Sequence, residues 1–148
     1  MEVATSAKDA AATAASPVVL VVDDNETTAR ALQRVLHAAH IKAAIVFRGA
    51  EAIEYAQHHP LAAAVVDIHL PDLNGLVVTQ KLREQLGPDL PIIILSGDTS
   101  MGLLNSLPHV GATYFFSKPV NSAHLVQRLH EWVGRPSSDG AQRPDGQG

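Results

Sequence analysis

Short apolar runs alternate with amphipathic stretches through the middle of the chain. The apolar runs continue without alternation, which is the pattern of β-strands buried on both faces. They predict strands at 18–22, 43–47, 62–66, 92–95 and 112–116. Between and after them, the apolar residues recur every three or four positions, as on one face of a helix. This spacing predicts helices from Asn25 onward, at 49–59, 75–86 and about 99–107, and from Asn121 onward.

Residues with special backbone chemistry mark the ends of several predicted helices. Asn25 and Asn121 stand at N-cap positions, and Gly134 follows the last helix at its C′ position. Pro60 is expected to end the second helix and Pro108 the fourth, because proline has no amide hydrogen to donate. The fourth helix is the weakest of the five predictions.

Five strand–helix units in succession predict an α/β fold. Parallel strands need crossover connections, so the helices should cover both faces of a doubly wound parallel sheet. In such sheets the chemistry sits beyond the carboxyl ends of the strands, where the topology reverses. Polar residues at those ends are therefore candidates for function.

The remainder of the sequence bounds the folded unit. The Ala-rich segment 1–16 and the polar segment 135–148 are expected to be disordered tails, the latter because it has no large aliphatic side chain to bury. Residues 17–134 should then form one domain. Because neither flanking segment is expected to fold into a second domain, the sequence suggests a single-domain protein.

Charge and composition exclude several classes of function. The 148 residues include 15 acidic and 11 basic side chains, a formal net charge of −4, and no cysteine. An acidic balance without a basic cluster argues against direct nucleic-acid binding. The lack of cysteine excludes disulfides and thiolate metal sites and is consistent with the cytoplasm. No apolar run is long enough to insert into a membrane.

Polar side chains gather where the predicted strands end. Asp23 and Asp24 follow the first strand, Asp67 the third, Ser96 the fourth and Lys118 the fifth. Three carboxylates on one rim cannot all stay ionised unless a cation joins them, and oxygen ligands suit Mg²⁺. An ammonium and a hydroxyl beside a carboxylate nucleophile are the groups that phosphoryl transfer requires.

The motifs at these strand ends resemble those of a known family. "VVDD", "VVDIHLPDLNG", "LSGD" and "FFSKP" are similar, in order and spacing, to the receiver domain of bacterial two-component response regulators, over residues 17–134. The resemblance implies a flavodoxin-like (βα)5 fold with strand order 2-1-3-4-5. It also implies that Asp67 accepts a phosphoryl group, and that Asp23, Asp24, Asp67 and the backbone carbonyl of His69 hold Mg²⁺.

The resemblance extends to the remaining site residues. Lys118 and Ser96 would contact the phosphoryl oxygens, and Ser96 with Phe115 would act as the switch pair. A cis peptide is expected between Lys118 and Pro119. The implied function is a phosphorylation-activated switch rather than an enzyme. Its donor would be a sensor histidine kinase or a histidine phosphotransfer protein, and its output a downstream protein bound by the fourth helix, fifth strand and last helix.

Other interpretations of the same residues stay open at this stage. Asp23-Asp24-Asn25 alone could be a turn and helix cap, and Phe115 alone could be a core residue. Asn74-Gly75 indicates turn chemistry. His37 and His40 could share a helix face and invite a metal hypothesis, but no carboxylate sits at a supporting position. A small Mg²⁺-dependent aspartyl-phosphate phosphohydrolase and a phosphorylation-independent pseudo-receiver are the alternative functions.

Overall fold

The computed structural model describes residues 17–97, 101–110 and 114–133. Strands and helices alternate throughout: β1 (Val18–Val22), α2 (Glu26–Ala38), β2 (Ala43–Val46), α3 (Gly49–His58), β3 (Leu61–Asp67), α4 (Gly75–Leu86), β4 (Ile92–Ser96), α5 (Met101–Val110), β5 (Tyr114–Ser117) and α6 (Ser122–Val133). The two expected tails and Gly134 lie outside the described residues.

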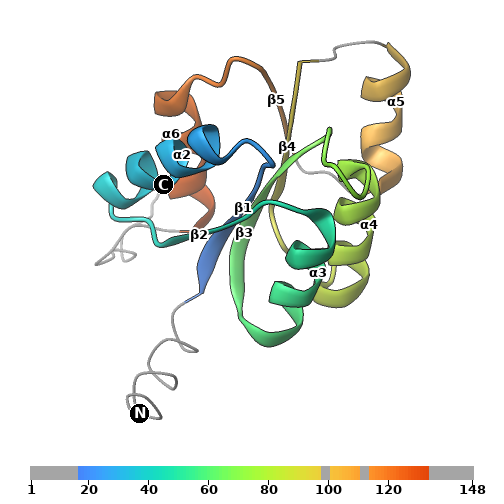
Figure 1. Ribbon diagram of the computed structural model, residues 1–148, viewed down its shortest axis with the longest axis horizontal. Coiled ribbons are helices and arrows are strands. Elements are labelled where there is room, and N and C mark those ends of the chain that lie inside the picture. The colour runs from blue at the N-terminus through green and yellow to red at the C-terminus, as the bar shows by residue number, and fades with distance from the viewer. Residues whose placement is uncertain (1–16, 98–100, 111–113, 134–148) are drawn as a thin grey trace.

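The strands form one parallel sheet in the order β2-β1-β3-β4-β5. Helices α2 and α6 cover one face and α3, α4 and α5 cover the other (Figure 1). The predicted doubly wound α/β fold and its strand order are therefore confirmed. The order places β1, β3 and β4 in the interior of the sheet, which explains why these strands are continuously apolar.

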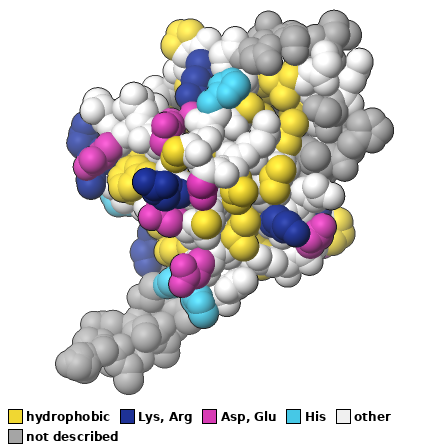
Figure 2. All heavy atoms as spheres, turned by 45° about the vertical axis from the view of Figure 1, so that its right-hand side comes forward, with side chains coloured by type: hydrophobic (Ala, Val, Ile, Leu, Met, Phe, Trp, Pro, Cys, Tyr) yellow, Lys and Arg dark blue, Asp and Glu magenta, His cyan; other side chains and the backbone are white. Residues whose placement is uncertain are grey.

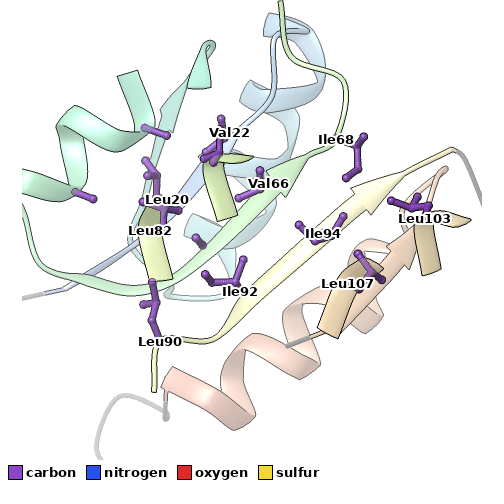
Figure 3. Packing of buried hydrophobic residues seen from close by; sticks show 14 residues of the cluster. Leu20, Val22, Val66, Ile68, Leu82, Leu90, Ile92, Ile94, Leu103 and Leu107 are labelled. Carbon is purple, nitrogen blue, oxygen red and sulfur yellow. The ribbon is translucent and has the colours of Figure 1, made fainter. Parts of the chain in front are cut away.

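Alternate residues of each central strand enter two separate core layers. Leu20, Val66 and Ile94 pack toward α3, α4 and α5, whereas Val21, Val65 and Leu95 pack toward α2 and α6. Figure 3 shows the first of these layers, with Leu82 of α4 and Leu103 and Leu107 of α5 against the strands. All the central strand residues just named are at most 1% exposed. The sheet is thus held rigidly from both sides.

The predicted helix caps are present at the two asparagines. Asn25 accepts a hydrogen bond from the backbone N–H of Thr28, and Asn121 accepts one from that of His124, both at 3.0 Å. Leu36 in α2 and Leu129 in α6, which lie on the predicted inner faces, are buried. Asn74 is also a cap rather than a simple turn residue, since its side chain accepts from Leu76 N at 2.7 Å.

The fourth predicted helix differs most from expectation. We expected Pro108 to end it, but α5 continues through Pro108 to Val110. Proline removes one ladder hydrogen bond and its ring conflicts with the carbonyl four residues earlier, but Pro108 lies only two residues before the end of α5, so the disruption falls in the last turn. The last strand also ends one residue later than predicted, at Ser117, which pairs with Ser96 of β4. Residues 99–100 and 112–113, predicted as helix and strand, lie outside the described ranges.

The surface on the α4 and α5 side combines apolar and charged groups. Figure 2, in which this side comes forward, shows hydrophobic side chains in a band with charged groups beside it. Val77 and Leu86 of α4 are 39% and 37% exposed. In the described part of the chain, none of the helices has the length and apolar character needed to cross a bilayer.

Candidate functional site

The carboxyl ends of the central strands bring together residues that are far apart in sequence. Asp23 directly follows β1, and its backbone N–H donates to Val46 O at 3.1 Å at the end of β2. Asp67 ends β3 and pairs in register with Leu95, one residue before Ser96 at the end of β4. Lys118 directly follows β5. The parallel register therefore aligns all these positions on one edge of the sheet.

Lys118 joins two of the three candidate carboxylates. Its ammonium group donates to Asp67 Oδ2 at 2.9 Å and lies 3.9 Å from Asp23 Oδ2. The Lys118 backbone N–H donates to Ser96 O at 2.9 Å, which fixes the end of β5 against the end of β4. The peptide between Lys118 and Pro119 is cis, as expected.

Asp23 is the most deeply buried carboxylate of the site. Its side chain is buried, and its Oδ1 accepts from the backbone N–H of Asn25 at 2.9 Å. Among the described residues, its Oδ2 has no hydrogen-bond partner. Burial raises the pKa of Asp23, and the nearby charge of Asp67 adds to this, whereas the Asn25 hydrogen bond and the charge of Lys118 lower it. A buried carboxylate oxygen without a donor calls for a positive partner.

The three carboxylates are placed to share such a partner. Oxygen atoms of Asp23, Asp24 and Asp67 all lie within 4.8 Å of one another, with Asp24 exposed at the rim and the other two buried. These are the one group of candidate metal ligands that converges among the described residues. An all-oxygen set with one exposed member suits a divalent cation such as Mg²⁺, which keeps some of its waters. Asp23 Oδ2, which has an ion pair with Lys118 but no hydrogen bond in the described structure, fits the same ion.

The other predicted residues take different places around this group. The His69 backbone N–H donates to Asp67 Oδ1 at 3.3 Å, while the His69 side chain is exposed. Ser96 is fully buried at the neighbouring strand end. Phe115 pairs in register with Ile94 and packs against the core layer that α3, α4 and α5 cover. The structure therefore joins Phe115 to the core rather than to the carboxylates.

Two residues that support the site were not identified as such from the sequence. A Cβ atom on Gly75 would overlap the backbone oxygen of Asp67 and come within 2.7 Å of Ile68 Cα, so only glycine allows α4 to begin this close to β3. Asp72 reaches back to the first amides of α3. Neither contact has a local sequence signal beyond the "LPDLNG" motif itself, because both partners are distant or are backbone atoms.

Comparisons with known proteins find related sequences over most of the described chain. The family model described as "Response regulator receiver domain" matches residues 19–130. The sensory/regulatory protein RpfC of Xanthomonas campestris pv. campestris is 31% identical over 114 residues. The transcriptional regulatory protein PrrA of Mycobacterium tuberculosis is 34% identical over 123 residues. These alignments cover 75% and 83% of this chain, but only 16% of RpfC and 52% of PrrA.

A solved structure extends the similarity to three dimensions. It is the receiver domain of the sensor histidine kinase PA1611 from Pseudomonas aeruginosa PAO1, crystallised with a magnesium ion coordinated in its active-site cleft. The two structures superimpose with a TM-score of 0.72 at 27% identity, over 80% of this chain and 98% of that one.

Proposed function

This chain belongs to the response regulator receiver domain family, and from that premise we propose that it is a phosphorylation switch whose phosphoacceptor is Asp67. The observation that carries the proposal is the 2.9 Å contact between Lys118 Nζ and Asp67 Oδ2 beside two further carboxylates. Asp67 is buried, and the Lys118 ammonium group donates a hydrogen bond to one of its oxygens. A phosphoryl group arriving there would find an ammonium donor already at the acceptor.

The proposed reaction moves a phosphoryl group from nitrogen to oxygen. The donor is a phosphohistidine of a sensor histidine kinase or a histidine phosphotransfer protein. A carboxylate oxygen of Asp67 attacks phosphorus, the O–P bond forms as the N–P bond breaks, and the imidazole keeps the electron pair and takes up a proton. Lys118 then donates to a phosphoryl oxygen, and the hydroxyl of Ser96 to another.

A metal ion held by the acidic group would supply the second positive charge. We assign Asp23, Asp24, Asp67 and the backbone carbonyl of His69 as the Mg²⁺ ligands. Bound there, Mg²⁺ would neutralise negative charge on the phosphoryl oxygens. The magnesium ion in the PA1611 receiver domain supports this assignment. Asp23 and Asp24 otherwise repel an incoming phosphate, which is why the metal is needed.

The switch would pass from the site to the surface through β4 and β5. Ser96 and Phe115 lie on these paired strands, and Phe115 is half-buried against the core. Movement of Ser96 toward a phosphoryl group would leave space into which Phe115 can turn. A packed core has discrete arrangements, so a small shift there becomes a change of surface shape.

We assign the output surface to α5, β5 and α6, where a downstream protein would dock. A groove of about 490 Å³ runs along β5 and α6 and is lined by Tyr114, Phe115, His124 and Arg128 among others. Chemical shifts in 97–116 and 121–133 should therefore change when beryllofluoride and Mg²⁺ are added. Shift changes confined to another face would contradict this surface. Direct nucleic-acid binding is not proposed. A cytoplasmic location is part of the proposal, because the proposed phosphohistidine donor would act there.

Two alternative functions lead to other measurements. A phosphohydrolase of the aspartyl-phosphate type would use a second carboxylate two residues after the nucleophile, where this chain has the exposed His69. A pseudo-receiver would lack part of the acceptor set, whereas here Asp67 and Lys118 are in contact. Repeated turnover of a small phosphate ester would favour the first alternative. Failure of any acyl-phosphate to form would favour the second.

The experiment that tests the proposal is labelling by acetyl phosphate. The full chain is incubated with acetyl phosphate and Mg²⁺, and the modified residue is located by mass spectrometry. We expect one phosphoryl group on Asp67, lost in Asp67→Asn and without Mg²⁺. Asp89→Asn, which removes an exposed carboxylate from the loop between α4 and β4, serves as the charge-matched control and should be labelled as wild type. Labelling elsewhere, or independent of metal, would contradict the assignment.

A further inference from the structure

Helix α3 begins without a cap from its own sequence. Arg48 occupies the N-cap position in an extended conformation and makes no side-chain hydrogen bond to the helix. Instead, the carboxylate of Asp72, from the loop between β3 and α4, accepts from Gly49 N at 2.8 Å and from Ala50 N at 2.9 Å. The first two amides of α3 are therefore satisfied by a residue more than twenty positions away.

The same loop is anchored at two further points. Leu73 packs against Gly49, where an added Cβ would lie 3.0 Å from the Leu73 side chain. At the end of the loop, the Gly75 N–H donates at 2.8 Å to the backbone oxygen of Ile68, the residue that directly follows Asp67. Asp72 and the candidate ligand residues Asp24 and His69 line one common pocket. The anchor and the acidic site thus share a single short segment of backbone.

We propose that Asp72 is a positioning residue for the metal site. By capping α3, it holds the loop between β3 and α4 in the conformation that presents the His69 backbone and fixes Asp67. This inference rests on the proposed function, because the effect expected of Asp72 is on the Mg²⁺ that Asp67 and the His69 carbonyl would hold. Asp72 is not one of the assigned Mg²⁺ ligands, and its carboxylate accepts from the α3 amides, so its effect would pass through the loop.

The charge of Asp72 suits this task. The two amide hydrogen bonds favour the ionised carboxylate and lower the pKa of Asp72. A negative charge at the start of a helix also interacts favourably with the helix dipole. An asparagine could accept through one oxygen only, and an alanine through none. The three side chains therefore form a graded series in which the anchor weakens stepwise.

The experiment measures two quantities in the full chain. Mg²⁺ affinity is measured by isothermal titration calorimetry, and protection of the Gly75 amide is measured by NMR hydrogen exchange in the metal-free protein. We expect Asp72→Ala to weaken Mg²⁺ binding about tenfold, the lower end of the cost of losing an outer-shell support, and to reduce Gly75 protection. Asp72→Asn should fall between. Glu54→Gln, which removes an exposed charge from α3, is the matched control and should behave as wild type.

A rescue variant separates positioning from helix stability. Arg48→Ser gives α3 a cap of its own, so Arg48→Ser/Asp72→Ala should recover the unfolding free energy that Asp72→Ala loses. We expect Mg²⁺ affinity and Gly75 protection to stay low in this double variant, since the loop is still unanchored. Arg48→Ser alone measures any effect of the lost arginine charge. Recovery of both Mg²⁺ affinity and Gly75 protection in the double variant would show that Asp72 acts only by stabilising α3, and would overturn the inference.

The remaining outcomes distinguish this inference from the proposed function. A wild-type protein that binds Mg²⁺ and is labelled on Asp67, together with an Asp72→Ala protein of unchanged Mg²⁺ affinity, would overturn the inference alone. A wild-type protein that binds no Mg²⁺ would overturn the metal site of the proposed function, and the inference with it.

Discussion

The ammonium group of Lys118 lies between two buried carboxylates, 2.9 Å from Asp67 Oδ2 and 3.9 Å from Asp23 Oδ2. Only the first of these contacts is a hydrogen bond. Lys118 therefore serves as a counterion to Asp23 and Asp67 in the metal-free protein. These two carboxylates are also candidate ligands for a divalent cation. The Lys118 charge should assist phosphorylation of Asp67 and should also weaken Mg²⁺ binding by repulsion. The labelling rate and the Mg²⁺ affinity measure these two effects separately.

Lys118→Met should separate these two effects. The methionine keeps most of the apolar stem but removes the positive charge, so Mg²⁺ should bind about three- to tenfold more tightly because a nearby like charge is gone. Labelling of Asp67 by acetyl phosphate should nevertheless become slower, since a donor to the phosphoryl oxygens is lost. Calorimetry and labelling rates test the two halves. Weaker Mg²⁺ binding in the variant would contradict the competition.

Asp23→Asn should stabilise the metal-free protein while removing its metal site. The asparagine oxygen can still accept from the Asn25 N–H, and the change removes a buried charge whose Oδ2 has no hydrogen-bond partner in the described structure. We expect a gain of about 0.5–2 kcal/mol in unfolding free energy at neutral pH. Urea denaturation without divalent ions measures it. A loss of stability would mean that Asp23 is better compensated than its contacts indicate.

The pH dependence of stability should carry the signature of Asp23. Its folded pKa is raised above the unfolded value of 3.8, so the folded protein binds this proton more tightly. The resulting stability is fully present below pH 3.8 and is lost as the pH rises through the folded pKa. The advantage of Asp23→Asn over wild type should therefore grow as the pH rises from about 4 to 7, the range that begins at the usual carboxyl pKa.

Asp72 should show the opposite trend. Its folded pKa is lowered, so its stabilising contribution is present above pH 3.8 and is lost as the pH falls through the folded pKa. The difference between wild type and Asp72→Asn should shrink in acid. Denaturation curves at a series of pH values, without divalent ions, measure both trends in the same experiment. If the unfolding free energies of Asp23→Asn and Asp72→Asn both ran parallel to that of wild type across this pH series, the pKa directions assigned to Asp23 and Asp72 would be contradicted.

Gly75→Ala should damage the fold and the site together. The new Cβ would overlap the Asp67 backbone, so either α4 or the end of β3 must move. We expect a loss of about 1–3 kcal/mol, typical of overpacking in a rigid core, with slower labelling of Asp67. Gly102→Ala in α5, where a Cβ meets nothing within 4 Å, is the control and should be neutral or slightly stabilising. Equal losses in both variants would refute the steric explanation.

Much of this structure follows from short-range pattern. The continuous apolar runs at 18–22 and 92–95 predict buried parallel strands, because only a sheet covered on both faces can bury every residue of a strand. The asparagine caps are equally local, since a cap contacts amides three residues away. Pro108 shows the limit of such rules, because α5 continues past it.

The sequence by itself determined the sheet, its helices and the residues that stand at the strand ends. Only the tertiary structure decided which atoms meet there. Lys118 reaches Asp67 across 51 residues, and Asp72 caps α3 across more than twenty. Such contacts depend on strand register and on loop conformation, which are fixed by packing of the whole domain rather than by neighbouring residues. For the same reason the burial of Asp23, and hence its raised pKa, exists only once the fold has closed over it.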